Sequence, residues 1–256
     1  MEGDPLILAL LALFGLLGGI GITAVGPGGV LPTIGMFLLT GLPPAGVAGT
    51  AIATHIATGA LGTAAYTRSG QLREPGTRRI ALVLSAVAVA GAPLGVFLNT
   101  LVSGQGFAVL LAAAVAVTGF LVWVRERRAV PESEDRPVRL RPATAVAVGF
   151  TVSVAAGLFG LGGPMLSVPL LVLCGLPLLP ALAAAQAQSV IIAGAGTVGY
   201  AVHGSIDWPL ALLVGLPELA GVMIGWKIAR VVPVRKLKYA LAATLLALAP
   251  YLALHG

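Results

Sequence analysis

Two titratable side chains lie inside long apolar stretches of this sequence, where a charge is costly. His55 is the eleventh residue of the stretch 45–66, and Glu218 is the eleventh residue of the stretch 208–229. An ionisable residue at such a depth is typical of a functional site, and buried carboxylates often relay protons. We therefore expect Glu218 to carry a proton, with His55 as a second proton site. The alternative is a structural role, in which Glu218 pairs with Lys227 or with a backbone amide.

Two glycine-rich breaks interrupt the apolar sequence, and a short apolar segment follows each of them. They read Gly-Pro-Gly-Gly and Gly-Leu-Gly-Gly. Glycines leave backbone N–H groups accessible, and the N-terminus of a following helix carries partial positive charge. The breaks therefore predict an anion-binding site, whereas the alternative is a pair of tight turns between packed helices. The predicted binding glycines are Gly26, Gly28, Gly29, Gly160, Gly162 and Gly163.

Polar side chains near the middle of the next apolar segment in each half complete this predicted site. Unpaired polar groups are costly in an apolar interior, so each of them needs a partner. Neutral donors suit an oxyanion that must bind and then leave, although hydrogen bonds between helices would use the same residues. The predicted binding residues of these two clusters are Thr50, Thr54, His55, Gln186, Gln188 and Ser189.

The composition identifies the class of elements that must position these residues. Of the 256 residues, 58% are hydrophobic and 9% are charged, and the mean hydropathy is +1.02. A soluble domain carries roughly 25% charged residues, which excludes a water-soluble enzyme. In lipid the backbone is satisfied only in helices or closed barrels, and the apolar runs here are too long for barrel strands. We predict an all-α polytopic membrane protein.

The apolar segments differ in length in a regular way. Five precede a polar linker and five follow it, and most are long enough to cross a hydrocarbon core of about 30 Å. The second segment of each half is a half-helix that reaches about half of that distance. Either all five segments of a half cross, or the first two form a re-entrant pair and three cross. The segments are 6–25, 30–40, 45–66, 78–100, 106–124, 143–159, 164–174, 179–202, 208–229 and 236–254.

The two halves resemble each other when they are aligned without gaps so that Gly26 falls on Gly160. This alignment matches the glycine-rich breaks and places Gly41-Leu42-Pro43 on Gly175-Leu176-Pro177. All fifteen Lys and Arg residues lie in 68–79, 125–141 and 227–238, which the positive-inside rule places in the cytoplasm. Corresponding loops then face opposite sides, so we predict two inverted repeats with both termini outside. The predicted division is a first repeat at 1–124, a cytoplasmic linker at 125–142 and a second repeat at 143–256.

These features resemble one known family. The paired breaks, the segment ends Tyr66…Gly70 and Tyr200…Gly204 and the basic linker are similar to the sulfite exporter TauE/SafE family over about residues 6–254. The resemblance implies a multi-pass anion permease of the bacterial plasma membrane, with sulfite, sulfonates or related sulfur compounds as substrates. Members are commonly drawn with seven or eight full spans, fewer than the ten segments here.

We expect a secondary transporter that exports a small sulfur oxyanion by alternating access. Uptake, passive flow through a channel, and a non-transporting partner of a membrane assembly stay open as alternatives. Its expected partners are the anion and the lipid bilayer, without nucleic acid, and the oligomeric state is undetermined. Transport driven by protons, by sodium or by the membrane potential alone also stays open.

Other chemistries lack the residues that they need. No Gly-x-Ser-x-Gly elbow exists for a hydrolase, and the single cysteine, Cys174, excludes a cysteine-based metal cluster. His55 and His203 lie at different predicted depths, which argues against a haem held by two axial histidines. We therefore expect neither an enzyme nor a bound cofactor or metal.

Overall fold

The protein is a bundle of helices, known here from a computed structural model that describes residues 4–127, 140–231 and 235–255. Within these ranges it has no strand, which confirms the predicted all-α class. Each predicted apolar segment is one helix, and its bounds differ from the prediction by at most three residues. The helices are α1 (Pro5–Ala24), α2 (Val30–Leu39), α3 (Pro44–Arg68), α4 (Pro75–Thr100), α5 (Gly104–Arg127), α6 (Pro142–Phe159), α7 (Pro164–Leu173), α8 (Leu178–Val202), α9 (Trp208–Val231) and α10 (Arg235–His255), with short 3-10 helices η1 (Pro27–Gly29) and η2 (Gln71–Arg73).

Helix length and composition identify a multi-pass membrane protein. Six helices are long and apolar enough to cross a membrane: α1, α4, α5, α6, α8 and α9. Helix α3 has 25 residues but is less apolar, because it carries threonines, glycines and His55, and much of it is buried in the bundle. Helices α2 and α7 have only ten residues each, so each extends about 15 Å. They correspond to the predicted half-helices.

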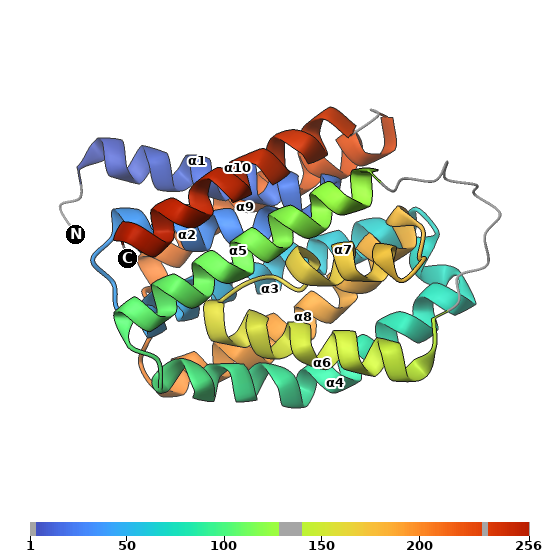
Figure 1. Cartoon of the computed structure of the whole chain (residues 1–256), viewed down its shortest axis with the longest axis horizontal. Helices are drawn as coiled ribbons and strands as arrows, with labels where there is room; N and C mark the ends of the chain where they lie inside the picture. Colours follow the sequence, from blue (N-terminus) through green and yellow to red (C-terminus); the bar gives the residue numbers. More distant parts are fainter. Residues whose placement is uncertain (1–3, 128–139, 232–234, 256) are drawn as a thin grey trace.

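The short helices form hairpins with the helices before them. Helix α2 runs back toward the end of the molecule where α1 begins, and α7 runs back toward the end where α6 begins (Figure 1). The turn after α2, at Leu42 and Pro43, accordingly lies beside the turn between α8 and α9, around one cavity of about 550 Å³. Of the two open topologies, this geometry favours a hairpin followed by three long helices in each half.

Each half packs mainly on the other half. Helix α1 packs along α9 and α4 along α6, while α3 packs on α8 and α5 on α10. Glycines allow the closest contacts, since Gly19 faces the α9 backbone at Glu218 and Gly95 faces the α6 backbone at Val154. The matched partners agree with two related halves. Their inverted relationship and the division at residues 125–142, most of which lies outside the described residues, stay predictions.

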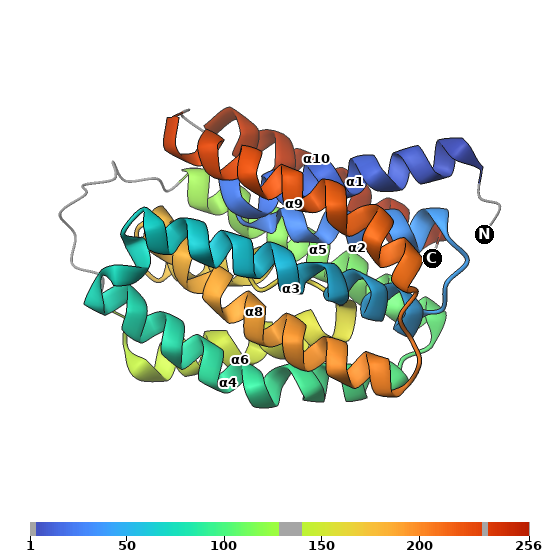
Figure 2. The ribbon, with the colours of Figure 1, turned by 180° about the vertical axis from the view of Figure 1, so that it is seen from behind.

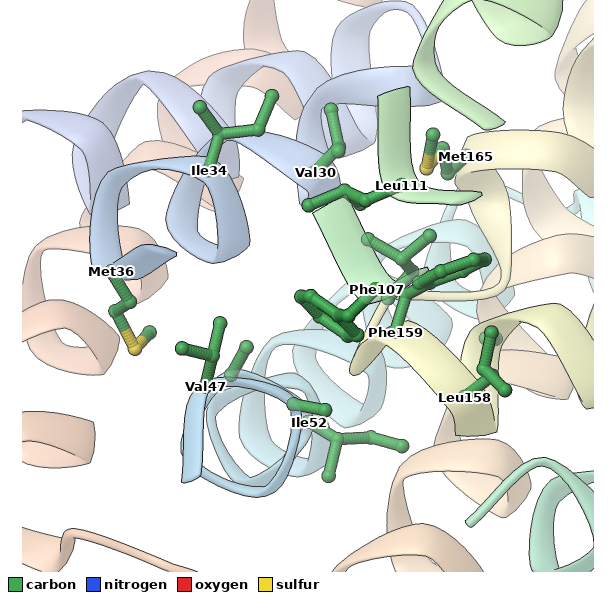
Figure 3. Packing of buried hydrophobic residues seen from close by; sticks show 14 of the residues in the cluster. Val30, Ile34, Met36, Val47, Ile52, Phe107, Leu111, Leu158, Phe159 and Met165 are labelled. Atoms are coloured by element: carbon green, nitrogen blue, oxygen red, sulfur yellow. The ribbon is translucent and has the colours of Figure 1, made fainter. Parts of the chain in front are cut away.

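A buried apolar cluster fixes the positions of the two hairpins. Phe107 of α5 lies between Phe37 of α2 and Phe159 of α6, with ring centroids 5.7 Å apart in both pairs. Figure 3 shows this cluster, in which Val30 and Met165, near the starts of α2 and α7, also take part. The glycine-rich breaks that precede these two helices are therefore held inside the bundle.

The helix ends that carry the basic segments gather at one end of the molecule. Helices α3, α5 and α9 end there, and α4, α6 and α10 begin there (Figure 1). The view from behind shows the start of α1 and the end of α10 at the opposite end (Figure 2). This arrangement agrees with the sequence prediction that the basic segments share one face. Which side of the membrane that face occupies stays a prediction.

Candidate functional site

His55 and Glu218, which lie far apart in the sequence, are in direct contact. Nδ1 of His55, on α3, lies 3.0 Å from Oε1 of Glu218, on α9, and the two side chains are 1% and 0% exposed. Nε2 of His55 and Oε2 of Glu218 have no hydrogen-bond partner among the described residues. The predicted proton sites thus form one buried pair, and the expected alternative of a Glu218–Lys227 pair is replaced by His55.

The imidazole ring of His55 also faces both glycine-rich breaks. A methyl group on Gly29 would lie 3.4 Å from Cε1 of His55, and one on Gly162 would lie 3.7 Å from Cδ2. These carbons are the two ring neighbours of Nε2. The edge of the ring that carries Nε2 is therefore turned toward the two breaks, while Nδ1 is turned toward Glu218. One side chain connects the carboxyl group with the predicted anion site.

Backbone conformation explains the first glycine of each break. Gly26 has φ +111° and Gly160 has φ +71°, a region that residues with a Cβ rarely adopt. Gly26 also lies against Val168 of α7, and Gly160 lies against the backbone of Ala48 on α3. These two glycines let the chain reverse and let the hairpins pack, and their predicted role in anion binding stays untested.

The remaining glycines divide into packed and open positions. Gly28 lies against the α1 backbone at Gly18 and Gly21, which leaves no room for a side chain. Gly163 donates its N–H to Oγ of Ser189, 3.3 Å away. A methyl group on Gly162 would make only ordinary van der Waals contacts, and the nearest atom would be Oγ of Ser189 at 3.5 Å. Gly29 and Gly162 are thus the predicted glycines that the structure brings beside His55, and Ser189 lies beside Gly162 and Gly163.

The two predicted threonines point elsewhere. Oγ1 of Thr50 accepts a hydrogen bond of 3.0 Å from the N–H of Asp207, in the turn between α8 and α9. Oγ1 of Thr54 donates to the carbonyl of Ala51, 2.9 Å away in its own helix. Both hydroxyls have protein partners, and neither contacts the breaks in this structure. Their predicted role in anion binding stays untested.

The two predicted glutamines have different surroundings. Nε2 of Gln186 lies 3.4 Å from the carbonyl of Ile22, near the end of α1, and its Oε1 has no partner among the described residues. Oε1 of Gln188 instead accepts from Oγ of Ser167 at 2.6 Å, and its Nε2 donates to the carbonyl of Gly149 at 3.0 Å. The amide of Gln188 therefore joins α8 to α6 and α7.

Several buried polar residues that were not among the predicted site residues also make hydrogen bonds between helices. Oγ of Ser153 accepts from Nε2 of Gln188 at 3.1 Å, and Ser167 is the donor to Oε1 of Gln188. Tyr66 donates to the carbonyl of Thr23 and Tyr200 donates to that of Gly157, each at 2.8 Å. The alignment of the two halves that places Tyr66 on Tyr200 also places Thr23 on Gly157. The alignment of the two halves could therefore have predicted these two hydrogen bonds, because it matches the donor tyrosines and also the residues whose carbonyls accept.

The site combines one basic side chain, His55, with one acidic side chain, Glu218. Within the described ranges there is no group of three or more His, Cys, Asp or Glu side chains that would hold a metal ion. His203, at the end of α8, is exposed and its Nδ1 lies 2.7 Å from the Gly199 carbonyl, remote from this cluster. The arrangement is suited to exchange of a proton between His55 and Glu218. It also allows Nε2 of His55 to offer an N–H group toward the breaks.

Comparison with known proteins gives one family and several relatives. The model of the family "Sulfite exporter TauE/SafE" matches residues 11–252. A "Probable membrane transporter protein" of Xylella fastidiosa (strain 9a5c) is 30% identical over 138 residues, and that alignment spans about half of each chain, 52% in both. The "Probable membrane transporter protein YdhB" of Bacillus subtilis (strain 168) is 24% identical over 242 residues, which are 93% of this chain and 96% of the relative. No solved structure matches.

Proposed function

This chain belongs to the sulfite exporter TauE/SafE family, a family of membrane transporters, and we propose that it exports a small sulfur oxyanion by alternating access. The proposed substrate class is sulfite or a sulfonate. The proposed location is the bacterial plasma membrane, with the basic segments inside and both termini outside, as the positive-inside rule indicates. The partners in this proposal are the anion and the lipid bilayer.

The observation that carries the proposal is the position of the His55 ring between the two breaks. Its Nε2 edge faces Gly29 and Gly162, and the half-helices α2 and α7 begin directly after those breaks. Helix N-termini and exposed backbone N–H groups attract anions, and the imidazole adds a side-chain donor. The three oxygens of a sulfite or sulfonate group point away from sulfur in different directions, and they match donors that converge from several directions.

The two hairpins supply support for alternating access. They enter the bundle from opposite ends (Figure 1), and each ends its first helix at a break that faces the same histidine. Discontinuous helices of this kind, in matching positions of two halves, are typical of transporters whose site lies near the middle of the membrane. A movement of one half against the other would then open the site to one side at a time.

The direction and the driving ion are the finer parts of this proposal. Glu218 is the proposed proton carrier, because it is a buried carboxyl with a titratable partner. Sodium coupling through backbone carbonyls and potential-driven exit are the competing mechanisms. Uptake through the same site is the alternative direction, and flux in liposomes with imposed gradients separates them.

The test is flux of radiolabelled sulfite and methanesulfonate into liposomes that contain the purified chain. Gly162→Val places a branched side chain between Ser189 and the His55 ring, and we expect flux to fall at least about tenfold while the folded protein persists. Gly194→Val is the matched control, since a side chain at Gly194 meets nothing within 4 Å. Gly28 is unsuitable for this purpose, because a side chain there collides with the α1 backbone.

Three outcomes are decisive. Flux that falls in Gly162→Val but not in Gly194→Val supports a site between the breaks. Normal flux in both variants would show that the breaks are only turns. Absence of sulfite and sulfonate flux in the folded wild-type chain would contradict the transport proposal and favour a non-transporting membrane partner.

A further inference from the structure

The His55–Glu218 pair is unusual because its outer atoms are unpartnered although both side chains are fully buried. Nδ1 and Oε1 lie 3.0 Å apart, while Nε2 on one side and Oε2 on the other have no partner among the described residues. Buried polar atoms are normally satisfied, and the exceptions often mark functional sites. The free nitrogen faces Gly29 and Gly162, where the proposed anion would bind.

The charges around the pair decide what can bind there. Glu218 and His55 are the only titratable groups within the cluster itself, among the described residues. Tyr66 and Tyr200 donate their hydroxyls to backbone carbonyls elsewhere. Lys227 comes nine residues after Glu218 on α9, which is about 14 Å along the axis. The described residues of α1, η1, α2 and α7 carry no titratable or charged side chain. The other such residues on or beside the packed elements are Asp4 before α1, Arg68 on α3, Cys174 after α7, His203 after α8, Asp207 before α9 and Arg230 on α9.

Charge balance then links the anion to a proton. When His55 is an imidazolium beside an ionised Glu218, the pair has no net charge. A monovalent anion at Nε2 would add an uncompensated negative charge in an apolar interior, which is strongly unfavourable. If Glu218 takes one proton from water, the imidazolium keeps both of its protons, and its counter-ion becomes the bound anion. The site is neutral again.

We propose, as an extension that rests on the proposed function, that this site binds one proton together with each monovalent sulfonate and carries both in the same direction without net charge. Glu218 holds the proton and Nε2 of His55 holds the sulfonate group. The anion leaves the cell along its own concentration gradient, and a proton accompanies it. The membrane potential contributes nothing to the movement of a monovalent substrate.

Methanesulfonate is the probe, because it stays fully ionised and so carries no proton of its own, unlike sulfite. Liposomes with the full-length protein are loaded with methanesulfonate and a pH-sensitive dye, and a potential of about 100 mV is imposed with potassium and valinomycin. We expect one proton to leave with each anion and the equilibrium anion ratio to be unchanged by the potential. Uncoupled anion flow would shift that ratio about fifty-fold.

Binding in detergent gives a second readout that does not depend on flux. Above the midpoint of proton uptake, one linked proton raises the Kd of methanesulfonate tenfold for each pH unit. His55→Gln removes the cation, and we expect it to weaken binding at least about tenfold. The double variant His55→Gln/Glu218→Gln places two neutral amide side chains at these positions and serves as a folding control. His203 is exposed, so His203→Gln should leave the pH profile of binding unchanged.

Each result points to a distinct conclusion. Methanesulfonate flux that carries current without a pH change overturns the coupling but leaves the transporter in place. Unchanged binding in His55→Gln, or sulfite binding without any sulfonate binding, overturns the role given to His55 or to sulfonates. If neither sulfite nor methanesulfonate moves through folded wild-type protein, the proposed function itself fails.

Discussion

Buried polar groups differ between two helix contacts of the molecule. One is the contact between α3 and α9, and the other is the contact of α8 with α6 and α7. In the first, His55 and Glu218 make one close contact, and an outer atom of each lacks a partner among the described residues. In the second, the Gln188 amide accepts from Ser167 and donates to the carbonyl of Gly149, so that both of its polar atoms are engaged. The first contact is titratable and incomplete, whereas the second is neutral and satisfied.

This difference indicates a division of roles between the two contacts. A satisfied neutral network is costly to open and holds helices together, whereas an unsatisfied pair can accept a ligand or a proton. The alignment that matches the breaks places Ser189 on His55, and the one that matches Gly91 with Gly221 places buried Ala88 on Glu218. Neither His55 nor Glu218 therefore aligns with a titratable residue in the other half. The alignment of the halves gives no second pair of this kind.

Removing the Gln188 amide should have the largest effect on stability. Gln188→Ala leaves Ser167 without its acceptor and opens a cavity, so we expect a loss of about 2–4 kcal/mol. Glu218→Gln keeps the shape of the side chain beside His55, and should cost about 1 kcal/mol or less. Thermal unfolding of both variants in detergent measures the contrast.

The same pair of variants tests the division of roles. A larger stability loss in Glu218→Gln than in Gln188→Ala would reverse it. A rise of tenfold or more in the anion Kd of Gln188→Ala would restore the anion-binding role that the sequence predicts for Gln188.

The two buried tyrosines test how alike the halves are where their contacts match. Tyr66→Phe and Tyr200→Phe each remove one hydroxyl that donates to a carbonyl 2.8 Å away. We expect similar losses of about 1–2 kcal/mol, because each change leaves one buried carbonyl without this donor. The two shifts in Tm are measured side by side. A difference above about 1 kcal/mol would mean that the halves differ in rigidity as well as in chemistry.

The caps of the matched helices α4 and α9 give the smallest expected effect. Glu74 caps α4 by accepting from the N–H groups of Gly76 and Thr77, and Asp207 caps α9 by accepting from Leu210 at 3.0 Å. Slight burial raises the pKa of Glu74, but these hydrogen bonds outweigh it and hold the pKa below its usual value. Glu74→Ala should cost about 1 kcal/mol.

The pH dependence of that loss has a definite sign. A carboxyl group whose pKa is lowered by folding stabilises the protein above its ordinary pKa, and this contribution disappears as the pH falls through the folded-state pKa. The difference in Tm between wild type and Glu74→Ala should therefore shrink in acid. A constant difference across that range would show that the loss does not depend on the charge of Glu74.

Hydropathy determined the helices because each segment must satisfy its own backbone in lipid. All ten segments were therefore predictable from local sequence, including the short ones at 30–40 and 164–174. The glycine-rich breaks were equally visible, since Gly26 and Gly160 adopt backbone angles that few other residues tolerate. The position of each polar residue within its apolar segment was also visible in the sequence. It identified His55 and Glu218 as candidate proton sites.

The membership of the site was less predictable than its location. The reasoning that selected Ser189 also placed Thr50 and Gln188 beside the anion. In the structure, Thr50 pairs with the N–H of Asp207 and Gln188 pairs with Ser167. The reason is that a polar residue at mid-helix points to one of several neighbours, and the sequence alone does not give the rotation of a helix about its axis.

The sequence by itself thus determined the membrane class, the number and length of the described helices and the two breaks, all of which depend on interactions within a segment. Only the tertiary structure decided that His55 of α3 meets Glu218 of α9, that its free nitrogen faces Gly29 and Gly162, and that Gln188 turns toward α6 and α7. Those contacts depend on how helices pack and rotate against each other. Small residues at the helix surfaces control that packing through van der Waals contact over many positions at once.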